Sequence, residues 1–343
     1  MIKTIRKNCR ALFCEPDGTV WVASGLCFFC IDKTGSIISN KYSVGNVFQR
    51  FFSRFRILRQ GLRIGIHHLI VLNNGNILVC TKRSLILVDR KTGKILNNFS
   101  DFIGNKPAHQ GICVDEKGSI YFGEYSLNKE RQYPISLLKS DDGGLTFYKV
   151  FSFGKGTIRH IHFITYDYFE KCLWLGTGDN DNECFLMKSV DGGHSWQTIG
   201  SGNQLWRAIG ICVTERYLFW GTDAGHVNSN NYFLKFDKKT GTLEKIFNSY
   251  GPCHGSAIYF GNKIFLSTGV EGGKNEHDRI ARLYSISDDM VECVFTGKKD
   301  IFPFVIQYGV FRFPLNTACC KSVFCTTMGL KHGGESVIIY EKK

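Results

Sequence analysis

Residues 111–153, "GICVDEKGSIYFGEYSLNKERQYPISLLKSDDGGLTFYKVFSF", contain four short apolar runs separated by polar turns rich in glycine and aspartate. Runs of this length that are rich in β-branched and aromatic side chains, and are bounded by such turns, are typical of β-strands. The runs "GICV" and "SIYFG" flank a tight turn, and two further runs follow in "ISLLKS" and "YKVFSF". The stretch therefore predicts one four-stranded antiparallel unit.

Comparable units recur along the chain. Pairs of strands joined by a turn begin at six positions, which are Ala11, Leu69, Gly111, His162, Gly210 and Ser256. Their spacing of roughly 42–58 residues is that of four-stranded β-propeller blades. We therefore predict an all-β propeller, with the whole chain, residues 1–343, in a single domain.

A seventh unit is indicated near the C-terminus by "FVIQYGVFRF", "SVFCTTMG" and "SVIIYEKK", but it has only three strands of its own. The N-terminal "MIKTIRK" precedes the first blade and would supply the missing outer strand, which would leave no open sheet edge. The sequence thus predicts a seven-bladed propeller closed by an N-terminal strand. Six blades with an appended C-terminal piece is the alternative.

One frame, Ser-x-Asp-x-Gly-x-(Ser/Thr)-aromatic, occurs twice, as "SDDGGLTF" at residues 140–147 and as "SVDGGHSW" at residues 189–196. The aspartate of such a frame can accept hydrogen bonds from nearby backbone N–H groups, and the glycines allow unusual backbone angles. We interpret the frame as a staple for the turn between the third and fourth strands of a blade.

The frame resembles the Asp-box, or BNR repeat, of sialidases and related glycosyl hydrolase-like propellers. In that superfamily the Asp-box lies on the periphery, away from the catalytic face, so the resemblance implies no catalytic role for Asp142 or Asp191. The early Arg-Ile-Pro motif of true sialidases is missing from this sequence, and their propellers have six blades. We therefore expect a scaffold of this kind without sialidase activity.

The chain carries a formal net charge of +13, which favours anionic partners such as acidic glycans, nucleic acid or anionic lipid. No nucleic-acid-binding module accompanies the charge, so nucleic acid is not the expected partner. The 14 cysteines show no Cys/His zinc spacing, and the N-terminus lacks the apolar core of a signal peptide. We expect a cytoplasmic protein with reduced thiols, peripheral to the inner face of the membrane if residues 47–65 bind lipid.

In a propeller, the first strand of each blade starts, and the second ends, at the same mouth of the central channel. Residues at these positions converge although they lie far apart in the sequence. Six of the 10 histidines fall at the starts of first strands, namely His67, His68, His109, His160, His162 and His254. Gln110 and Arg207 share this position, and the ends of second strands carry Glu124, Asp179, Asp181, Asp223, Asn228 and Glu271.

These residue types support two kinds of chemistry. Histidines can hold one divalent metal ion, Mn, Zn or Ca, which would polarise a carboxylate, and paired carboxylates can act as acid and base on a sugar. The mouth is similar in type to the three-His-plus-Gln manganese site of oligogalacturonate lyases. We predict metal ligands at His109, His160 and His254, catalytic groups at His160, His162, Asp179, Asp181 and Asp223, and substrate-binding groups at Arg207, Gln110, Glu124 and Asn228.

The expected function is that of a carbohydrate-active propeller, either a glycoside hydrolase or a metal-assisted polysaccharide lyase, acting on an acidic or membrane-linked glycan. The alternative is a non-catalytic propeller scaffold that binds glycan or protein at a membrane surface, since propellers host both roles. A histidine at a blade start also occurs as a structural residue bonded to the backbone of a neighbouring strand.

A basic insertion, residues 47–65, lies between the first two blades and reads "VFQRFFSRFRILRQGLRIG", with five arginines and no acidic residue. Phe48, Phe51, Phe52 and Phe55 follow helical spacing. This composition predicts an amphipathic helix, which either lies on an anionic membrane or docks on the propeller with its Phe side chains buried.

Overall fold

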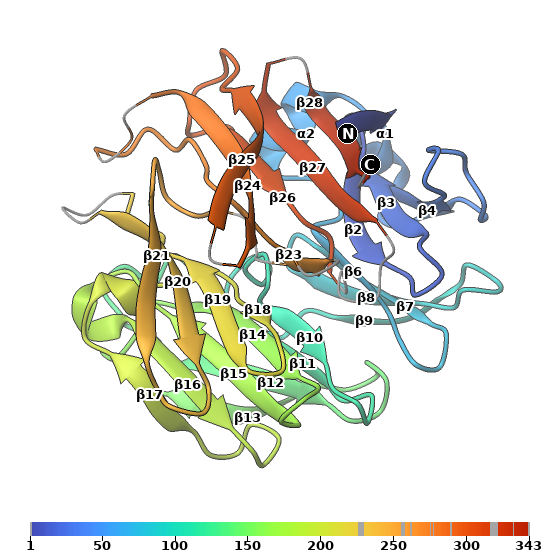
Figure 1. The fold of residues 1–343 in the computed structure, drawn as a ribbon. Coiled ribbons are helices and arrows are strands. Elements are labelled where there is room, and N and C mark those ends of the chain that lie inside the picture. Colours follow the sequence, from blue (N-terminus) through green and yellow to red (C-terminus); the bar gives the residue numbers. More distant parts are fainter. Residues whose placement is uncertain are drawn as a thin grey trace.

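Seven four-stranded antiparallel sheets follow one another around a central axis in the computed structural model (Figure 1). The structure describes residues 2–225, 230–254, 258–260, 263–274, 276, 278–288, 290–315, 322–331 and 333–341. The first strands of neighbouring blades contact one another at the axis. The prediction of a seven-bladed all-β propeller is confirmed, and the six-bladed alternative is wrong.

The blades are built in chain order, and within each blade the strands run from the central axis to the outer edge of the sheet. Blades one and two contain β2 (Arg10–Cys14), β3 (Val20–Ser24), β4 (Cys27–Ile31) and β5 (Tyr42–Ser43), then β6 (His68–Val71), β7 (Ile77–Thr81), β8 (Ser84–Val88) and β9 (Ile95–Phe99). Blades three and four contain β10 (Ile112–Val114), β11 (Ile120–Gly123), β12 (Ile135–Ser140) and β13 (Tyr148–Phe153), then β14 (Ile161–Asp167), β15 (Cys172–Thr177), β16 (Phe185–Ser189) and β17 (Gln197–Ser201). Blades five and six contain β18 (Cys212–Val213), β19 (Tyr217–Gly221), β20 (Asn231–Asp237) and β21 (Leu243–Ser249), then β22 (Ile258–Phe260), β23 (Lys263–Ser267), β24 (Ile280–Ser287) and β25 (Met290–Lys298). Blade seven contains β26 (Val310–Arg312), β27 (Val323–Leu330), β28 (Gly334–Tyr340) and β1 (Ile2–Lys7).

The seventh blade takes its outermost strand from the N-terminus. β1 pairs with β28 in antiparallel register, from Ile2 opposite Tyr340 to Lys7 opposite Ser336. The two ends of the chain therefore lie side by side (Figure 1). This pairing covers backbone N–H and C=O groups that β28 would otherwise expose, and it confirms the predicted closure.

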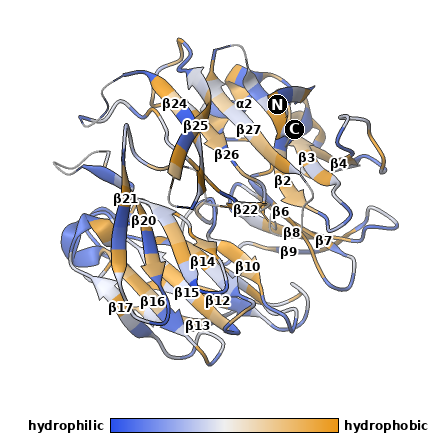
Figure 2. Ribbon diagram, viewed as in Figure 1, coloured by the Kyte–Doolittle hydropathy of each residue, from blue (hydrophilic) through white to orange (hydrophobic). Residues whose placement is uncertain are grey.

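Apolar side chains concentrate along the strands, and polar residues occupy many of the connecting turns (Figure 2). The largest fully buried side chains are Trp21, Trp174 and Trp220, each in the second strand of its blade. Their indole N–H groups donate to Glu15, Asp167 and Leu205, respectively, at 2.9–3.2 Å. A buried tryptophan is stable where its one donor has a partner, so these three positions combine a large apolar contact with a satisfied polar group.

Both repeated frames form the expected staple. Asp142 accepts hydrogen bonds from the backbone N–H groups of Leu145 and Thr146 at 3.0 and 2.9 Å. Asp191 accepts from the backbone N–H of Ser195 at 3.0 Å and from its hydroxyl at 2.6 Å. The two frames therefore fix the turns β12–β13 and β16–β17, and both aspartates have a structural explanation.

The insertion after blade one forms two short helices, α1 (Val47–Ser53) and α2 (Arg56–Leu62), rather than one continuous helix. Phe55 separates them in an extended conformation, with φ −89° and ψ 117°. The break lets one residue of each helix, Ser53 and Arg59, face the propeller and become buried.

The described part of the chain contains neither a disulfide nor a membrane-spanning helix. Its cysteines are free thiols, and most of them are buried. Its longest helices are too short and too polar to cross a bilayer.

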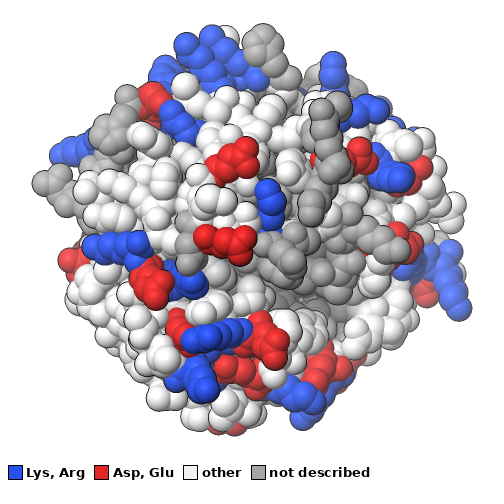
Figure 3. All heavy atoms as spheres, viewed as in Figure 1, with Lys and Arg blue, Asp and Glu red and all other residues white. Residues whose placement is uncertain are grey.

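Charge is spread unevenly over the surface. On the face drawn in Figure 3, Lys and Arg side chains gather at the upper edge, whereas acidic and basic side chains alternate along the lower edge. A net charge of +13 thus produces local basic regions that an anionic partner would meet first.

We predict that removal of residues 2–7 lowers the free energy of unfolding by on the order of 3 kcal/mol, because the interstrand hydrogen bonds of β1 contribute roughly 0.5–1.5 kcal/mol each. Urea-induced unfolding of the two chains would measure the difference. The variant Lys3→Ser, which keeps the strand and changes an exposed side chain, should unfold like the original protein. Unchanged stability of the truncated chain would show that the closure contributes little.

Candidate functional site

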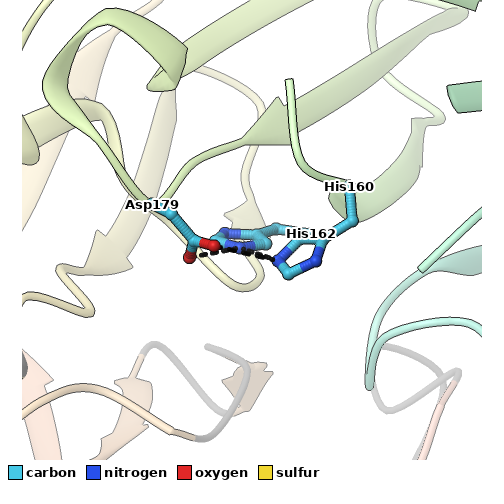
Figure 4. A group of neighbouring side chains, drawn as sticks. All are labelled: His160, His162 and Asp179. Carbon is cyan, nitrogen blue, oxygen red and sulfur yellow. Dashed lines mark hydrogen bonds and ion pairs between the residues drawn. The ribbon is translucent and has the colours of Figure 1, made fainter. Parts of the chain in front are cut away.

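Two histidines and one aspartate of the fourth blade come together at the channel mouth (Figure 4). His160 directly precedes β14, His162 is the second residue of that strand, and Asp179 follows β15. Residues two apart on a strand point to the same side, and the β14–β15 hairpin returns Asp179 to the same mouth. The potential ligand atoms of the three residues all lie within 4.8 Å of one another.

Both histidine rings are held in a fixed orientation. Nδ1 of His160 donates to the carbonyl oxygen of Ser126 at 2.9 Å, and Nδ1 of His162 donates to that of Ala208 at 3.2 Å. Because a carbonyl oxygen only accepts, each Nδ1 carries a proton, so the neutral form of each ring has its lone pair on Nε2. The two Nε2 atoms face each other at 3.0 Å. A metal ion beside them could accept the Nε2 lone pairs of both rings in their neutral forms.

This donor set fits a divalent metal ion. His160 and His162 would offer Nε2, and Asp179 would offer a carboxylate oxygen, which lies 3.7 Å from Nε2 of His162 and 3.8 Å from Nε2 of His160. A hydrogen bond from Nδ1 to a carbonyl is the outer contact that commonly orients a metal-binding histidine. Imidazole and carboxylate together suit Mn or Zn better than Ca, which prefers oxygen ligands alone.

The surrounding charges keep Asp179 ionised and His160 neutral. Oδ2 of Asp179 lies 2.6 Å from Nη1 of Arg159, and Oδ1 lies 3.1 Å from Nη2 of Arg207. Burial alone would raise the pKa of Asp179, but His162, His160 and Arg207 hold that pKa well below its ordinary value. Burial, together with repulsion from His162, lowers the pKa of His160 to about 3. At neutral pH the His160 lone pair is therefore available to a metal ion.

The backbone at Asp179 is strained. Its φ of 129° lies in a region that residues other than glycine rarely occupy. Such a conformation costs on the order of 1–3 kcal/mol and tends to occur at functional sites, where the surrounding structure holds the residue in place. At Asp179 the two arginine contacts supply that restraint.

Arg207 connects this cluster to a second group of carboxylates. Oδ2 of Asp223 lies 3.3 Å from Nη2 of Arg207, so the guanidinium bridges Asp179 and Asp223. Nearby, His254 pairs with Glu271. Burial and the charge of Glu271, opposed by Arg207, raise the pKa of Asp223 to about 6. A carboxyl group with this pKa can take up and release a proton near neutral pH, as an acid–base catalyst must.

Other blades bring cations to the mouth that sequence analysis missed. Lys106 precedes β10, Arg312 ends β26, and Arg10 begins β2. Burial and the repulsion from Arg312 lower the pKa of Lys106 to about 8, and burial and the repulsion from Arg10 lower the pKa of Arg312 to about 10. Among the described residues, Nε of Arg312 is buried and has no hydrogen-bond partner. Arg10 is paired with Glu335, whereas the lowered pKa values of Lys106 and Arg312 indicate that their charges are incompletely compensated, so an anion in the channel would stabilise them.

The structure does not bring together the three histidines predicted as metal ligands. His160 lies with His162 and Asp179, whereas Nε2 of His109 donates to the carbonyl oxygen of Phe313 at 2.9 Å. His254 is occupied by its pair with Glu271. The donor set of the candidate metal site therefore comes from one blade and not from three.

Four of the other predicted site residues lie away from the cluster or outside the described residues. Glu124 is fully buried and accepts the backbone N–H groups of Ile103 and Ser136, each at 2.8 Å, which gives its carboxylate a structural role. Asp181 is exposed and accepts from Gln204 at 2.8 Å. Gln110 lines a mostly apolar cavity of about 290 Å³ in the channel. The last of the four, Asn228, lies outside the described residues.

A second cluster of potential ligands, formed by Asp167, Glu170 and Cys172, is explained by an ion pair. Nζ of Lys238 lies 2.8 Å from Asp167 and 3.6 Å from Glu170. The lysine supplies the positive charge that this cluster requires, so we assign no metal to it.

No protein-family model matches the chain, and no curated protein matches it in sequence. Solved structures share its fold. A catalytically inactive virginiamycin B lyase from Staphylococcus aureus with quinupristin has a TM-score of 0.62 and 14% identity, over 99% of this chain and 98% of that one. Oligogalacturonate lyase in complex with manganese has a TM-score of 0.61 and 11% identity, over 97% and 89% of the two chains.

The extracellular domain of a one-component system from B. thetaiotaomicron has a TM-score of 0.62 and 11% identity, and the match covers 99% of this chain and 40% of that one. The present chain thus spans less than half of that protein. These likenesses show a seven-bladed propeller whose structural neighbours include enzymes as well as a sensor domain. The resemblance of the repeated frames to the Asp-box of sialidases stays a prediction.

We predict that the purified protein binds about one Mn²⁺ or Zn²⁺ per chain, and that His162→Gln abolishes this binding because it removes a converging Nε2 donor. Elemental analysis after dialysis, and the shift in unfolding temperature on adding metal, would measure it. Metal at 100 times its dissociation constant stabilises a protein by about 2.7 kcal/mol.

The matched control for this metal test is His194→Gln, which changes an exposed histidine of a repeated frame. It should bind metal like the original protein. Equal metal content in the two variants, or none in the original protein, would contradict the assignment.

Proposed function

We propose that the chain is a metal-dependent carbohydrate-active propeller that binds an acidic glycan at its channel mouth and cleaves it by elimination. The observation that carries this proposal is the pair of facing Nε2 atoms of His160 and His162, 3.0 Å apart, next to the ionised Asp179. Manganese bound to oligogalacturonate lyase, a structural neighbour of the same fold, supports it.

The charge layout of the mouth favours an anionic sugar. Lys106 and Arg312 have depressed pKa values, and an arriving carboxylate would stabilise their charged forms. Arg guanidinium groups bind carboxylates through paired N–H donors, which also orient the sugar. A neutral sugar would leave the same cations uncompensated, so the site should discriminate in favour of an acidic residue.

Asp223 is the best-placed candidate for the base. Elimination starts when a base removes the proton on the carbon beside the sugar carboxylate. The glycosidic C–O bond then breaks, the proton is passed on to the departing oxygen, and an unsaturated sugar acid remains without consumption of water. A carboxyl group with a pKa of about 6 is suited to accepting this proton. A metal ion, when bound, would neutralise the sugar carboxylate and make the adjacent C–H more acidic.

The proposal predicts that uronate-containing oligosaccharides are cleaved in the presence of Mn²⁺, whereas neutral oligosaccharides are not. Ultraviolet absorbance of the new C=C bond would follow the reaction. Asp223→Asn should lower kcat by about 10²–10⁴-fold, the usual contribution of an acid–base group. Arg312→Ala should mainly raise KM, by about 10–100-fold, because it removes a charged contact to the substrate.

Arg216→Ala is the matched control for Arg312→Ala, because Arg216 pairs with Asp237 far from the mouth. It should leave both kinetic constants unchanged. New reducing ends without the absorbance change would indicate a glycoside hydrolase. Binding of acidic glycan without any turnover would assign the chain to the non-catalytic scaffolds.

The affinity for an acidic glycan should fall as the pH rises through about 8, the pKa of Lys106, because the protonated form attracts the anion and the neutral form does not. Titration calorimetry at several pH values would measure this. Lys106→Arg keeps its charge over the whole range, so its affinity should remain level. If the affinity of Lys106→Arg also fell through about pH 8, the pH dependence would come from another group and the prediction would be wrong.

A further inference from the structure

The polar sides of α1 and α2, the two helices of the insertion, face the propeller. The buried residues of α1 and α2 are Ser53 and Arg59. Arg59 pairs with Glu335 of β28 and donates to the backbone carbonyl of Ser53 at 2.8 Å. A helix that covers a protein core normally buries its apolar side chains. In α1 and α2 the polar side chains are buried instead. Of the two placements expected from the sequence, burial of the Phe side chains on the propeller is therefore wrong.

The apolar side of the insertion is turned to solvent. Eight large apolar side chains between residues 47 and 62 are at least 40% exposed. A second segment adds two more, and it is joined to the first by Arg56, which donates to Asp300 at 2.8 Å and lies over the ring of Phe302 at 5.0 Å. We call the combined surface the apolar rim, and its most exposed members are Val47, Phe48, Phe51, Ile57, Ile301 and Val305, at 53–86%.

Basic residues surround the apolar rim. Arg50, Arg54 and Arg63 are exposed, and residues 47–65 contain no acidic residue. A groove of about 700 Å³ next to α2 is lined by Lys82 and Arg83 as well as by apolar side chains. Aromatic and aliphatic side chains beside exposed cations are the composition with which interfacial segments bind bilayers that contain anionic lipid. A soluble monomer rarely leaves so many large apolar side chains together in water.

We propose that the apolar rim docks on the surface of a bilayer containing anionic phospholipid. The Phe and Ile side chains enter the boundary between headgroups and acyl chains, and the arginines meet the phosphates. α2 lies beside β28 (Figure 1) and shares Glu335 with Arg10, the first residue of β2 at the channel mouth. Docking therefore holds the mouth next to the membrane, where a glycan attached to a lipid would be presented. The docking surface itself does not depend on the proposed catalytic function.

Co-sedimentation with vesicles tests this proposal. We expect binding to vesicles of phosphatidylcholine with phosphatidylglycerol, and at least tenfold weaker binding to phosphatidylcholine alone, because the arginines need anionic headgroups. The double variant Phe48→Ser/Ile57→Ser should lose at least tenfold in affinity for the anionic vesicles. Both side chains are more than 60% exposed, so the fold should tolerate the change.

The matched control is Val190→Ser/Met290→Ser, which changes two equally exposed apolar residues outside the rim, at 77% and 71%. It should bind vesicles like the original protein, as should His162→Gln, which separates this test from that of the metal site. No vesicle binding, or equal binding by the two double variants, would overturn the proposal. A dimer that dissociates on Phe48→Ser/Ile57→Ser would also overturn it, since a second copy would then cover the rim.

Discussion

The pairing of β1 with β28 is the constraint on which the whole molecule depends. A propeller blade cannot bury both faces of its sheet alone, so each of the seven blades relies on its two neighbours. A ring provides two neighbours for every blade only if the last blade is complete, and here the completing strand comes from the other end of the chain. Closure then fixes the seven inner strands around one axis. Residues separated by more than a hundred positions, such as Lys106 and Arg312, reach the same channel mouth for this reason.

The channel mouth is electrostatically divided. Blades four to six contribute Asp179, Asp223 and Glu271, and the arginines among them are already engaged with these carboxylates. Blade seven and the loop before blade three contribute Arg312 and Lys106, two cations with depressed pKa values. A ligand with an anionic group at one end and a hydroxyl-rich body would match both halves. The proposal of an acidic sugar rests on this layout more than on any single residue.

The fold could be read from the sequence because each blade repeats the same alternation of apolar runs and turns, and because "MIKTIRK" had no other partner. The grouping of His160, His162 and Asp179 could also be predicted, since these residues lie at the ends of the two inner strands of a single blade. Lys106 and Arg312 were not, because one lies in a connecting loop and the other inside the strand "VFRF". The outward orientation of the Phe side chains of the insertion could not be foreseen either. It depends on Arg59 meeting Glu335, a residue 276 positions away.

Glu335 joins three parts of the molecule at one carboxylate. It lies on β28, which is paired with β1, and it accepts from Arg10 at the start of blade one and from Arg59 of the insertion. Burial would raise its pKa, but the two arginines hold that pKa below its ordinary value, so the carboxylate stays ionised. A mechanical load on the insertion is therefore transmitted through Glu335 to the seam that closes the ring. A force that pulls the helices outward would strain the pairing of β1 with β28, which closes the ring without a covalent bond.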